Sequence, residues 1–430
     1  MTAKKINVLI LGSGGREHAL TWKISQSALC GSLYVAPGNP GTAEIATNLE
    51  VAIQDFSAIQ KHIEEKSIEL LVIGPEQPLV TGLRDFLEKN LPPHFPLLII
   101  GPGQLGAQLE GSKSFAKKFM QRHAIPTASY FECTKDNLHE GEKFLRALPG
   151  PYVLKADGLA GGKGVIIEDH IDVAIAALRS MLSGKFGDAG TTVVIEEFLS
   201  GIECSVFAIK RGEKFVLLPS AKDYKRIGEG DTGLNTGGMG AVSPVPFFSG
   251  AFKEKVISQI VLPTVTGLVS EGIAYDGFLF FGLIHVNGNP YVIEYNCRLG
   301  DPETEAILPM IEDDFLAVLT EPIASWPTEL KMNSGYAATV VLAAGGYPEN
   351  PEKGKVIHIS QNKQGIIFHA GTTLQDGALL TSGGRVMNVV AQGASIQQAR
   401  TMAQELATEI QFENKYYRRD IGLDLERINE

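Results

Sequence analysis

Tyr152-Val-Leu-Lys-Ala-Asp-Gly-Leu-Ala-Gly-Gly-Lys-Gly-Val-Ile-Ile167 is the stretch of sequence that decides the fold of this chain. Two apolar segments flank a loop that is rich in glycine, with Lys155 before the loop and Lys163 inside it. The pattern predicts a strand, a glycine-rich loop and a second strand. Glycines let backbone N–H groups come close to a ligand, and lysines supply charge that suits phosphate. The stretch indicates either a polyphosphate held under the loop or a β-hairpin with a solvated turn.

The loop differs from the Walker phosphate-binding loop. That motif needs a glycine six residues before its lysine and a hydroxyl residue after it, and it opens a helix. Asp157 stands at the first of these positions and Gly164 at the second. The apolar residues 165–167 favour a strand, so we expect this loop to cover its ligand from a hairpin.

Composition limits the class of protein. The 430 residues predict two to four domains, and 44% apolar with 20% charged residues is typical of a soluble globular protein. A net charge of −11 argues against nucleic-acid or membrane-surface binding. We find no signal peptide and no apolar run near the ~20 residues that span a bilayer, so we expect a cytoplasmic protein. The four cysteines are scattered and fit neither a disulfide framework nor a zinc cluster.

Strands and helices alternate in the first hundred residues. Apolar strands are predicted at 6–11, 32–36, 70–73 and 97–100, with amphipathic helices between them. Such an alternation predicts a parallel, doubly wound sheet, whose ligands lie at the carboxyl ends of the strands.

The rest of the chain predicts mixed α+β units. A small unit at 125–192 holds the lysine hairpin, and a last unit begins after Trp326-Pro327. Between them we expect strands at 192–196, 203–209, 215–218, 277–285 and 290–294, and a helix at 251–271. Residues 227–240 carry almost no signal for regular structure. The glycine-dense loop at 231–244 is long enough to indicate function, whereas the charge run at 221–226 favours a solvated surface.

The first turn, Gly12-Ser-Gly-Gly-Arg-Glu-His18, follows directly after the first strand. It is similar to a dinucleotide fingerprint, but Glu17 stands where the third glycine belongs. Arg16 at a helix N-terminus adds positive charge, which suits a single phosphate better than a pyrophosphate. The alternative is a plain strand–helix turn with a surface arginine.

Two further strand ends carry polar side chains. Glu196 and Glu197 end an apolar strand. The backbone at 197–199 could bind the edge of a base, and Glu203 could bind ribose hydroxyls. The alternative is a strand end with two solvent-facing glutamates. Glu294 and Asn296 lie two apart, so a strand would point both to one face, as magnesium ligands require. Arg298 follows on that face and could clamp a carboxylate or developing phosphate charge. An edge strand with an alternating polar face would look the same.

Taken in order along the chain, these motifs resemble the ATP-grasp superfamily. More specific strings resemble the phosphoribosylamine–glycine ligase family, also called glycinamide ribonucleotide synthetases, and cover nearly the whole chain. The strings are G-S-G-G-R-E-H-A, A-P-G-N-P-G-T, G-P-E-Q-P-L-V, L-E-G-S-K-S-F-A-K, K-A-D-G-L-A-G-G-K-G-V, N-T-G-G-M-G-A-x-S-P, N-C-R-L-G-D-P-E-T, A-A-G-G-Y-P and S-G-G-R.

The resemblance implies an α/β multidomain fold in four parts. A Rossmann-like N-terminal domain with a doubly wound parallel sheet would span 1–104 and bind phosphoribosylamine. A central ATP-grasp domain would comprise 105–124 and 193–327, with an inserted lid at 125–192. A mixed α+β C-terminal domain would span 328–430.

The resemblance also implies the reaction and its residues. Glycine would be joined to 5-phosphoribosylamine through glycyl phosphate, with ATP cleaved to ADP and phosphate, in purine biosynthesis. Implied ATP-binding residues are Lys113, Lys155, Gly161, Gly162, Lys163, Gly164, Glu196, Glu197, Phe198, Leu199 and Glu203. Implied ligands of phosphoribosylamine are Gly12, Gly14, Gly15, Arg16, Gly38, Asn39, Pro40, Gly41, Thr42, Gly74, Pro75 and Glu76. Asp223 and Arg298 would hold the amino and carboxylate ends of glycine and, with Lys155, form the catalytic group. Glu294 and Asn296 would bind Mg²⁺ or Mn²⁺.

Three alternatives stay open on the sequence. Another ATP-grasp carboxylate–amine ligase or carboxylase would share the lid and the Glu294/Asn296 pair. A nicotinamide-dependent dehydrogenase is disfavoured by the missing third glycine and by the lack of an acidic residue at the end of the second strand. A nucleotide sensor would bind ATP without turnover. We expect a monofunctional, monomeric enzyme that acts on small molecules and binds neither nucleic acid nor membrane.

Overall fold

The computed structural model describes residues 4–159, 164–360 and 365–427. Its N-terminal part is a parallel sheet in the order β5-β4-β1-β2-β3. Leu9 and Leu11 of β1 pack into one hydrophobic core, whereas Val8 and Ile10 pack into another on the opposite face. Both faces are therefore covered, which confirms the predicted doubly wound sheet. The elements of this part are β1 (Ile6–Gly12), α1 (Gly15–Ser25), β2 (Cys30–Pro37), β3 (Thr47–Asn48), α2 (Phe56–Glu65), β4 (Leu70–Ile73), α3 (Glu76–Val80), α4 (Leu83–Asn90) and β5 (Leu98–Pro102).

The parallel sheet continues into an antiparallel one. Strand β5 pairs with β16 through Pro102 and Tyr275, so the two parts share one nine-stranded sheet. Strand β16 also pairs with β10 and β17, and β11 closes the far edge. The elements are α5 (Gln104–Gly111), α6 (Lys113–Arg122), β10 (Ile202–Arg211), β11 (Lys214–Leu217), α9 (Gly250–Val256), α10 (Leu262–Ser270), β16 (Tyr275–Val286) and β17 (Asn289–Asn296). The helix predicted at 251–271 is present, with a π-helical turn at Ile257–Val261 between α9 and α10.

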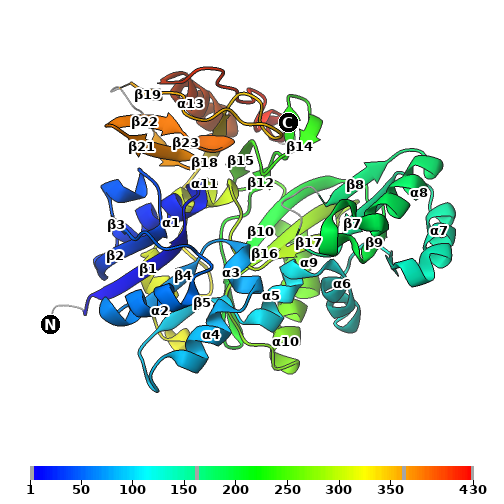
Figure 1. The fold of residues 1–430 in the computed structure, drawn as a ribbon, viewed down its shortest axis with the longest axis horizontal. Coiled ribbons are helices and arrows are strands. Elements are labelled where there is room, and N and C mark those ends of the chain that lie inside the picture. Colours follow the sequence, from blue (N-terminus) through cyan, green and yellow to red (C-terminus); the bar gives the residue numbers. More distant parts are fainter. Residues whose placement is uncertain (1–3, 160–163, 361–364, 428–430) are drawn as a thin grey trace.

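The lysine hairpin belongs to a separate four-stranded sheet in the order β6-β9-β7-β8, which projects from the body of the molecule (Figure 1). Strands β7 and β8 are antiparallel and bring Lys155 opposite Val165, so the predicted hairpin is confirmed. Gly161, Gly162 and Lys163 lie outside the described residues. The elements are β6 (Tyr130–Cys133), α7 (Leu138–Ala147), β7 (Tyr152–Ala156), β8 (Val165–Glu168), α8 (Ile171–Ser180) and β9 (Val193–Glu197).

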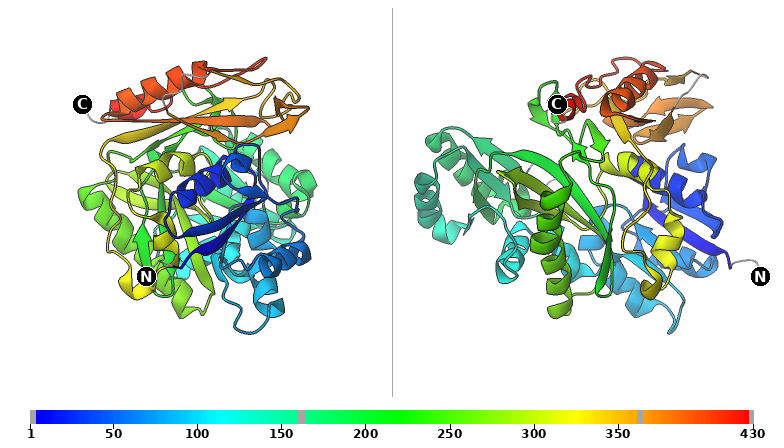
Figure 2. Two further views of the ribbon diagram at one scale, coloured as in Figure 1. Left: turned by 90° about the vertical axis from the view of Figure 1, so that its left-hand side faces the viewer. Right: turned by 180° about the vertical axis from the view of Figure 1, so that it is seen from behind.

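The C-terminal part is a five-stranded sheet in the order β12-β15-β18-β23-β20, with helix α13 against it. Figure 2 shows this layer lying across the rest of the molecule. Strands β12 (Lys222–Asp223) and β15 (Gly240–Ser243) come from the middle of the chain, so this sheet is assembled from distant segments. The other elements are α11 (Glu303–Ile307), α12 (Phe315–Thr320), β18 (Tyr336–Ala343), β19 (His358–Ile359), β20 (Ile366–His369), β21 (Thr372–Gln375), β22 (Ala378–Thr381), β23 (Arg385–Gly393), α13 (Ile396–Thr408), β24 (Ile410–Gln411) and α14 (Leu423–Glu426).

One expectation about secondary structure is wrong. Residues 227–240 do contain regular structure, because β13 (Arg226–Gly228) and β14 (Thr232–Asn235) form an antiparallel hairpin. Its turn is held by residues almost two hundred positions away, which a local pattern cannot reveal. Among the residues that the structure describes, no helix has the length and apolarity needed to cross a membrane.

Candidate active site

Two lysines share one buried carboxylate next to strand β7 of the lysine hairpin. Lys155 on β7 donates to Glu196 Oε2 on β9 at 3.0 Å and to the carbonyl of Ile293 on β17 at 3.1 Å. Lys117 on α6 lies 3.2 Å from the same Oε2, and its burial lowers its pKa to about 8 although Glu196 opposes the shift. Because Glu196 is only 4% exposed, the alternative of two solvent-facing glutamates is wrong for it.

Lys117 was missed on the sequence, where only Lys113 was considered. The two lysines are four residues apart on α6 and therefore share a helix face, which is the signal that could have found it. Lys113 lies at the start of the helix, and its Nζ is 3.4 Å from the carbonyl of Gly158 in the hairpin loop. Asp157 fixes this junction, because its carboxylate accepts a hydrogen bond from the backbone N–H of Ser114 at 2.6 Å.

Glu294 faces this group of cations. Lys225 lowers the pKa of Glu294 to about 2 against the opposing effect of burial, and Lys155 and Lys113 add to the shift. The carboxylate is therefore ionised at neutral pH. Lys113 and Lys155, predicted from the hairpin, thus converge on a residue predicted from a separate strand.

Asn296 lies two residues further along the same strand. The irregularity in the pairing of β16 and β17 at Gly282/Leu283 lies before Glu294, so Glu294 and Asn296 point to the same face. In the orientation that satisfies its neighbours, its Nδ2 donates to Glu110 Oε1 at 3.0 Å and to the carbonyl of Tyr295 at 3.3 Å. Among the described residues there is no cluster of three or more His, Cys, Asp and Glu side chains suited to a metal. One ionised carboxylate and one amide oxygen fit Mg²⁺, which retains waters and takes phosphate oxygens as further ligands.

The charge run at 221–226 is not a solvated surface, so that expectation is wrong. Lys222 and Tyr224 are buried, and the side chain of Asp223 is only 9% exposed. Lys225 Nζ lies 3.6 Å from Glu294 Oε1 and 3.9 Å from both Asp223 Oδ2 and Glu203 Oε2. Three carboxylates therefore surround one ammonium group, and Asp223 raises the pKa of Lys225 most strongly.

Arg298 links the strand of Glu294 to the N-terminal sheet. Its Nη2 lies 2.8 Å from Glu110 Oε1, and its Nε lies 3.5 Å from Oε2 of Glu76, the first residue of α3. Burial disfavours the ionised form of Glu76, but Arg298 and Arg16 outweigh burial and lower its pKa. Strand β17 ends at Asn296, so Arg298 lies on the loop that follows it.

The three loops predicted to bind phosphoribosylamine lie side by side. They follow β4, β1 and β2, which are adjacent and parallel. The backbone N–H of Gly38 donates to Gly12 O at 3.0 Å, and that of Gly74 donates to Leu11 O at 3.1 Å. The structure thus brings together Gly12–Gly15, Gly38–Thr42 and Gly74–Glu76 at one edge of the sheet.

Glu17 explains two of the glycines in these loops. Its carboxylate accepts a hydrogen bond from the N–H of Gly14 at 2.7 Å and fills the space between the loops. A Cβ at Gly12 would lie 2.5 Å from Glu17 Cδ, and a Cβ at Gly74 would lie 2.1 Å from Glu17 Oε1. Glu17, which stands where the fingerprint has its third glycine, therefore packs between the loops and holds them in place.

The polar side chains of these loops are engaged within the protein. Arg16 is 7% exposed, with its Nε 2.6 Å from Glu17 Oε1 and its Nη1 donating to Leu299 O at 3.1 Å, so the alternative of a surface arginine is wrong. Asn39 Nδ2 donates to the carbonyls of Ser13 and His369, both at 2.9 Å. These bonds tie the loops to one another, to the loop after β17 and to β20.

The predicted adenine segment connects the lid sheet to the central sheet. Glu197 Oε1 accepts a hydrogen bond from the N–H of Ser129 at 3.1 Å, at the end of β9. Phe198 is 42% exposed, and the side chain of Glu203, at the start of β10, is 51% exposed. Residues 197–203 therefore form the junction between lid and body.

Sequence reasoning missed two other polar groups near the site. Glu303 is 3% exposed, and burial together with Asp223 raises its pKa to about 7; its Oε1 accepts from Ser205 Oγ at 3.2 Å. Arg385 on β23 donates through Nη1 to the carbonyls of Gly237 and Asp301, both at 2.6 Å. Both residues lie in strings that carried the resemblance, N-C-R-L-G-D-P-E-T and S-G-G-R, which was the available signal.

The fold and the site together define a class. A doubly wound sheet that continues into an antiparallel sheet, with a separate lid sheet whose lysine hairpin meets a Glu-x-Asn strand, is the arrangement of an ATP-grasp ligase. Comparison with solved structures agrees: biotin carboxylase from Campylobacter jejuni superposes with a TM-score of 0.71 at 16% identity, covering 98% of this chain and 95% of that one. That likeness concerns the fold alone.

Comparison with known sequences identifies the family. Models of phosphoribosylglycinamide synthetase match at 6–110 (N domain), 111–304 (ATP-grasp domain) and 337–424 (C domain). The phosphoribosylamine–glycine ligase of Haemophilus influenzae is 45% identical over 433 positions, covering 97% of this chain and 98% of the relative. That of Pseudomonas aeruginosa is 45% identical over 427 positions, with 97% of both covered. The crystal structure of the Thermotoga maritima enzyme has a TM-score of 0.84 at 40% identity, covering 97% of this chain and 100% of that one. The chain belongs to the phosphoribosylamine–glycine ligase family.

Proposed function

We propose that this chain joins glycine to 5-phosphoribosylamine and cleaves ATP to ADP and phosphate, which makes it an enzyme of purine biosynthesis. The observation that carries the proposal is the convergence of Lys113, Lys155 and Glu294 beneath the lid hairpin, in a chain that matches this family over its full length. A phosphate-binding cation pair and an ionised metal ligand are what ATP-dependent phosphoryl transfer requires.

In this proposal ATP lies between the lid and the central sheet. Lys113 and Lys155 bind its phosphates, and the hairpin-loop residues Gly161, Gly162, Lys163 and Gly164 are assigned to the same phosphates. The backbone at Glu196–Leu199 receives adenine, and Glu203 receives the ribose. Glu294 and Asn296 hold Mg²⁺ or Mn²⁺, whose charge would draw electron density from the transferring phosphoryl group.

Glycine is assigned to the space between Asp223 and Arg298. Arg298 supplies a guanidinium for the carboxylate, and it is already held by Glu110 and Glu76. Asp223 supplies a carboxylate for the amino group, and Lys225 holds it in place. Opposite charges at the two ends fit an amino acid in its zwitterionic form.

Phosphoribosylamine is assigned to the loops at Gly12–Arg16, Gly38–Thr42 and Gly74–Glu76. Because Asn39, Thr42 and Arg16 are bound within the protein, we assign recognition to the backbone N–H groups that these residues hold in place. Glu76 links these loops to Arg298, so the amine is brought beside glycine.

The chemistry then needs no nucleophile from the protein. A carboxylate oxygen of glycine attacks the γ-phosphorus, the bond to ADP breaks, and glycyl phosphate forms. The amine nitrogen next attacks the glycyl carbon, the C–O bond to phosphate breaks, and the amine gives up a proton. The side chains contribute position and charge, and the lid excludes water from the acyl phosphate.

The acidic chain has small-molecule substrates and, in our proposal, acts as a monomer in the cytoplasm. The test of the function is a panel of acids and amines with purified protein, in which ADP formation is followed by a coupled assay. We expect ADP only when glycine and 5-phosphoribosylamine are both present. ADP formation with another acid–amine pair and none with this one would overturn the assignment and favour a different ATP-grasp ligase.

A further inference from the structure

We propose that Arg418 is a positioning residue for glycine use, because it fastens the segment that carries Asp223 and Lys225 to the C-terminal part of the chain. The inference rests on the proposed function, since the role of Asp223 toward glycine belongs to that proposal. We call the set of Arg418, Asp420 and Asp424 the C-terminal clamp.

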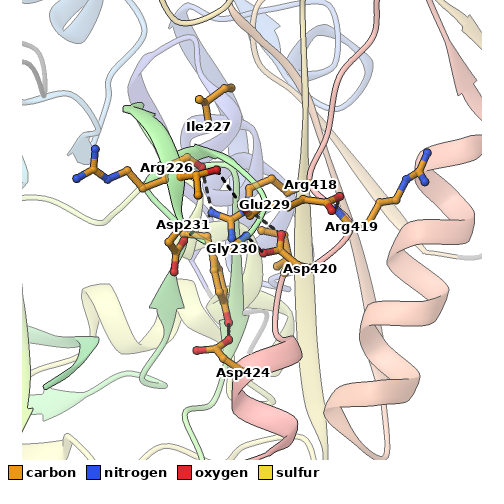
Figure 3. Close-up of polar contacts among 12 residues, drawn as sticks. Arg226, Ile227, Glu229, Gly230, Asp231, Arg418, Arg419, Asp420 and Asp424 are labelled. Carbon is orange, nitrogen blue, oxygen red and sulfur yellow. Dashed lines mark hydrogen bonds and ion pairs between the residues drawn. The ribbon is translucent and has the colours of Figure 1, made fainter.

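Arg418 is the centre of the clamp. It is only 1% exposed, and Figure 3 shows it among acidic side chains and the backbone of the β13–β14 hairpin. Its Nε and Nη2 contact the two oxygens of Asp420 at 2.8 and 2.7 Å. Its Nη1 contacts Asp231 Oδ1 at 2.7 Å and the carbonyl of Arg226 at 3.0 Å. One guanidinium thus joins the C-terminal segment to the start and to the turn of the hairpin.

The turn of the β13–β14 hairpin is held by hydrogen bonds to the C-terminal segment. Gly230 and Asp231 both have positive φ, at 67° and 54°. The N–H of Gly230 donates to Asp420 Oδ2 at 2.8 Å, and Glu229 Oε1 accepts from the N–H of Arg419 at 3.1 Å. Residues Thr232–Leu234 of β14 are exposed, so the hairpin has few buried contacts of its own and relies on the clamp.

The segment before the hairpin is fastened on the same side. Lys222 Nζ lies 2.8 Å from Asp424 Oδ2, and the hydroxyl of Tyr224 donates to Asp424 Oδ1 at 2.5 Å. The ring of Tyr224 contacts two cations, with Lys222 Nζ 4.0 Å and Arg418 Cζ 5.3 Å from its centroid. Lys222 and Tyr224 therefore anchor this strand to the clamp.

The intervening residues point the other way. Side chains alternate along an extended segment, so Asp223 and Lys225 face away from Lys222 and Tyr224. On their side lie Glu203 and Glu294, which contact Lys225. One short segment therefore carries the clamp contacts on one face and, on the other, Asp223, which is assigned to glycine, and Lys225, which contacts Glu294. A shift of the anchored face moves Asp223 relative to Arg298, which is held by a different part of the fold.

Arg418→Met tests the inference, because it keeps an unbranched apolar stem and removes the four contacts of the guanidinium. We expect the KM for glycine to rise about tenfold, which corresponds to the loss of one well-placed charged contact, with the KM for ATP within about twofold of wild type. Arg418→Lys, which cannot pair with both oxygens of Asp420, should fall between the two. Lys415→Met is the matched control, since the contacts of the Lys415 ammonium group, with the carbonyls of Ala407 and Ile410 and with the ring of Tyr417, all lie within the C-terminal part. It should lower Tm without changing the KM for glycine.

Asp231→Asn removes the charge of the hairpin residue that contacts Arg418. It tests the inference even if Arg418→Met does not fold. Its carboxylate is 57% exposed, so we expect a stable protein with a glycine KM raised about threefold. In the double variant the two effects should not add, because both remove one interaction. An unchanged glycine KM in Asp231→Asn, or equal losses for glycine and ATP in Arg418→Met, would overturn the inference. Absence of glycine-dependent ADP formation in the wild type would instead overturn the proposed function.

Discussion

Replacing Glu196 by Gln removes the carboxylate that two buried lysines share. Lys155 and Lys117 lie 3.0 and 3.2 Å from its oxygens, and all three side chains are at most 7% exposed. Removal of one partner from a buried ion pair costs about 3–5 kcal/mol when the remaining charge cannot respond. Here one of the two lysines, Lys117, can lose its charge, and its pKa limits how much it contributes to the loss of stability.

Lys117 can lose its proton. Its pKa is about 8 in the folded protein, so at pH 7 the neutral amine lies only about 1.4 kcal/mol above the ammonium form. As a neutral amine it still donates to Thr127 Oγ1, which lies 2.8 Å away. The part of the destabilisation that comes from Lys117 is therefore at most about 1.4 kcal/mol. Lys155 loses a charged hydrogen bond worth about 1.5–3 kcal/mol but keeps its bond to Ile293 O. We expect a total loss of about 3 kcal/mol at pH 7.

The pH dependence gives the sharper test. In the variant the folded state lacks a proton at Lys117 that the unfolded chain, with an ordinary pKa of 10.5, still binds. Its stability therefore rises with pH by about 1.4 kcal/mol per unit from pH 7 upward, whereas that of the wild type begins to rise only near pH 8. The difference between the two proteins should shrink by about 1.4 kcal/mol between pH 7 and about pH 9.

Urea unfolding followed by circular dichroism at both pH values measures this difference. Glu197→Gln is the matched control, because Glu197 follows on the same strand and accepts a single backbone hydrogen bond from Ser129. We expect it to change stability by less than about 1 kcal/mol at either pH. A Glu196→Gln variant as stable as the wild type at pH 7, or a loss that is equal at both pH values, refutes the reasoning.

Three further predictions follow from the site and its supports. Glu294→Ala should abolish ADP formation while leaving the melting temperature within a few degrees of wild type, since it removes a metal ligand at a partly exposed position; a near-normal kcat would contradict the metal role. Folding raises the pKa of Glu303 from 4.5 to about 7, so its destabilising effect grows as pH rises between these values and is constant above them. Glu303→Gln should therefore gain stability over the wild type between about pH 5 and about pH 7; a constant difference in thermal melts over this range would exclude this. Gly74→Ala should cost about 1–3 kcal/mol, because its Cβ would lie 2.1 Å from Glu17 Oε1, whereas Gly103→Ala, with its nearest atom at 3.3 Å, should cost less than half as much in the same melts.

The sequence predicted the parts of the fold that local patterns determine. The N-terminal strands were found because burial on both faces makes them continuous apolar runs, as at Val8–Leu11. The Glu294/Asn296 pair was found because alternation along a strand is regular. Both signals come from residues that are close together in the sequence.

The sequence could not show contacts between distant segments. The β13–β14 hairpin depends on Arg418 and Asp420, and the lysines of the charge run at 221–226 are paired within the protein, Lys222 with Asp424 and Lys225 with Glu294. A charged residue looks solvated until its partner is known, so Lys225 and the buried state of Arg16 were missed. Lys117 is different, since its spacing from Lys113 was visible and could have been used.

The central claim is that ATP activates the carboxylate of glycine at the site of Lys113, Lys155 and Glu294. Glycine labelled with ¹⁸O in both carboxylate oxygens tests it most directly, with the inorganic phosphate analysed by mass spectrometry after one turnover. If glycyl phosphate forms, the oxygen that attacked phosphorus leaves with the phosphate, so each phosphate released should carry one ¹⁸O. Phosphate without ¹⁸O, formed together with the amide product, would contradict the account.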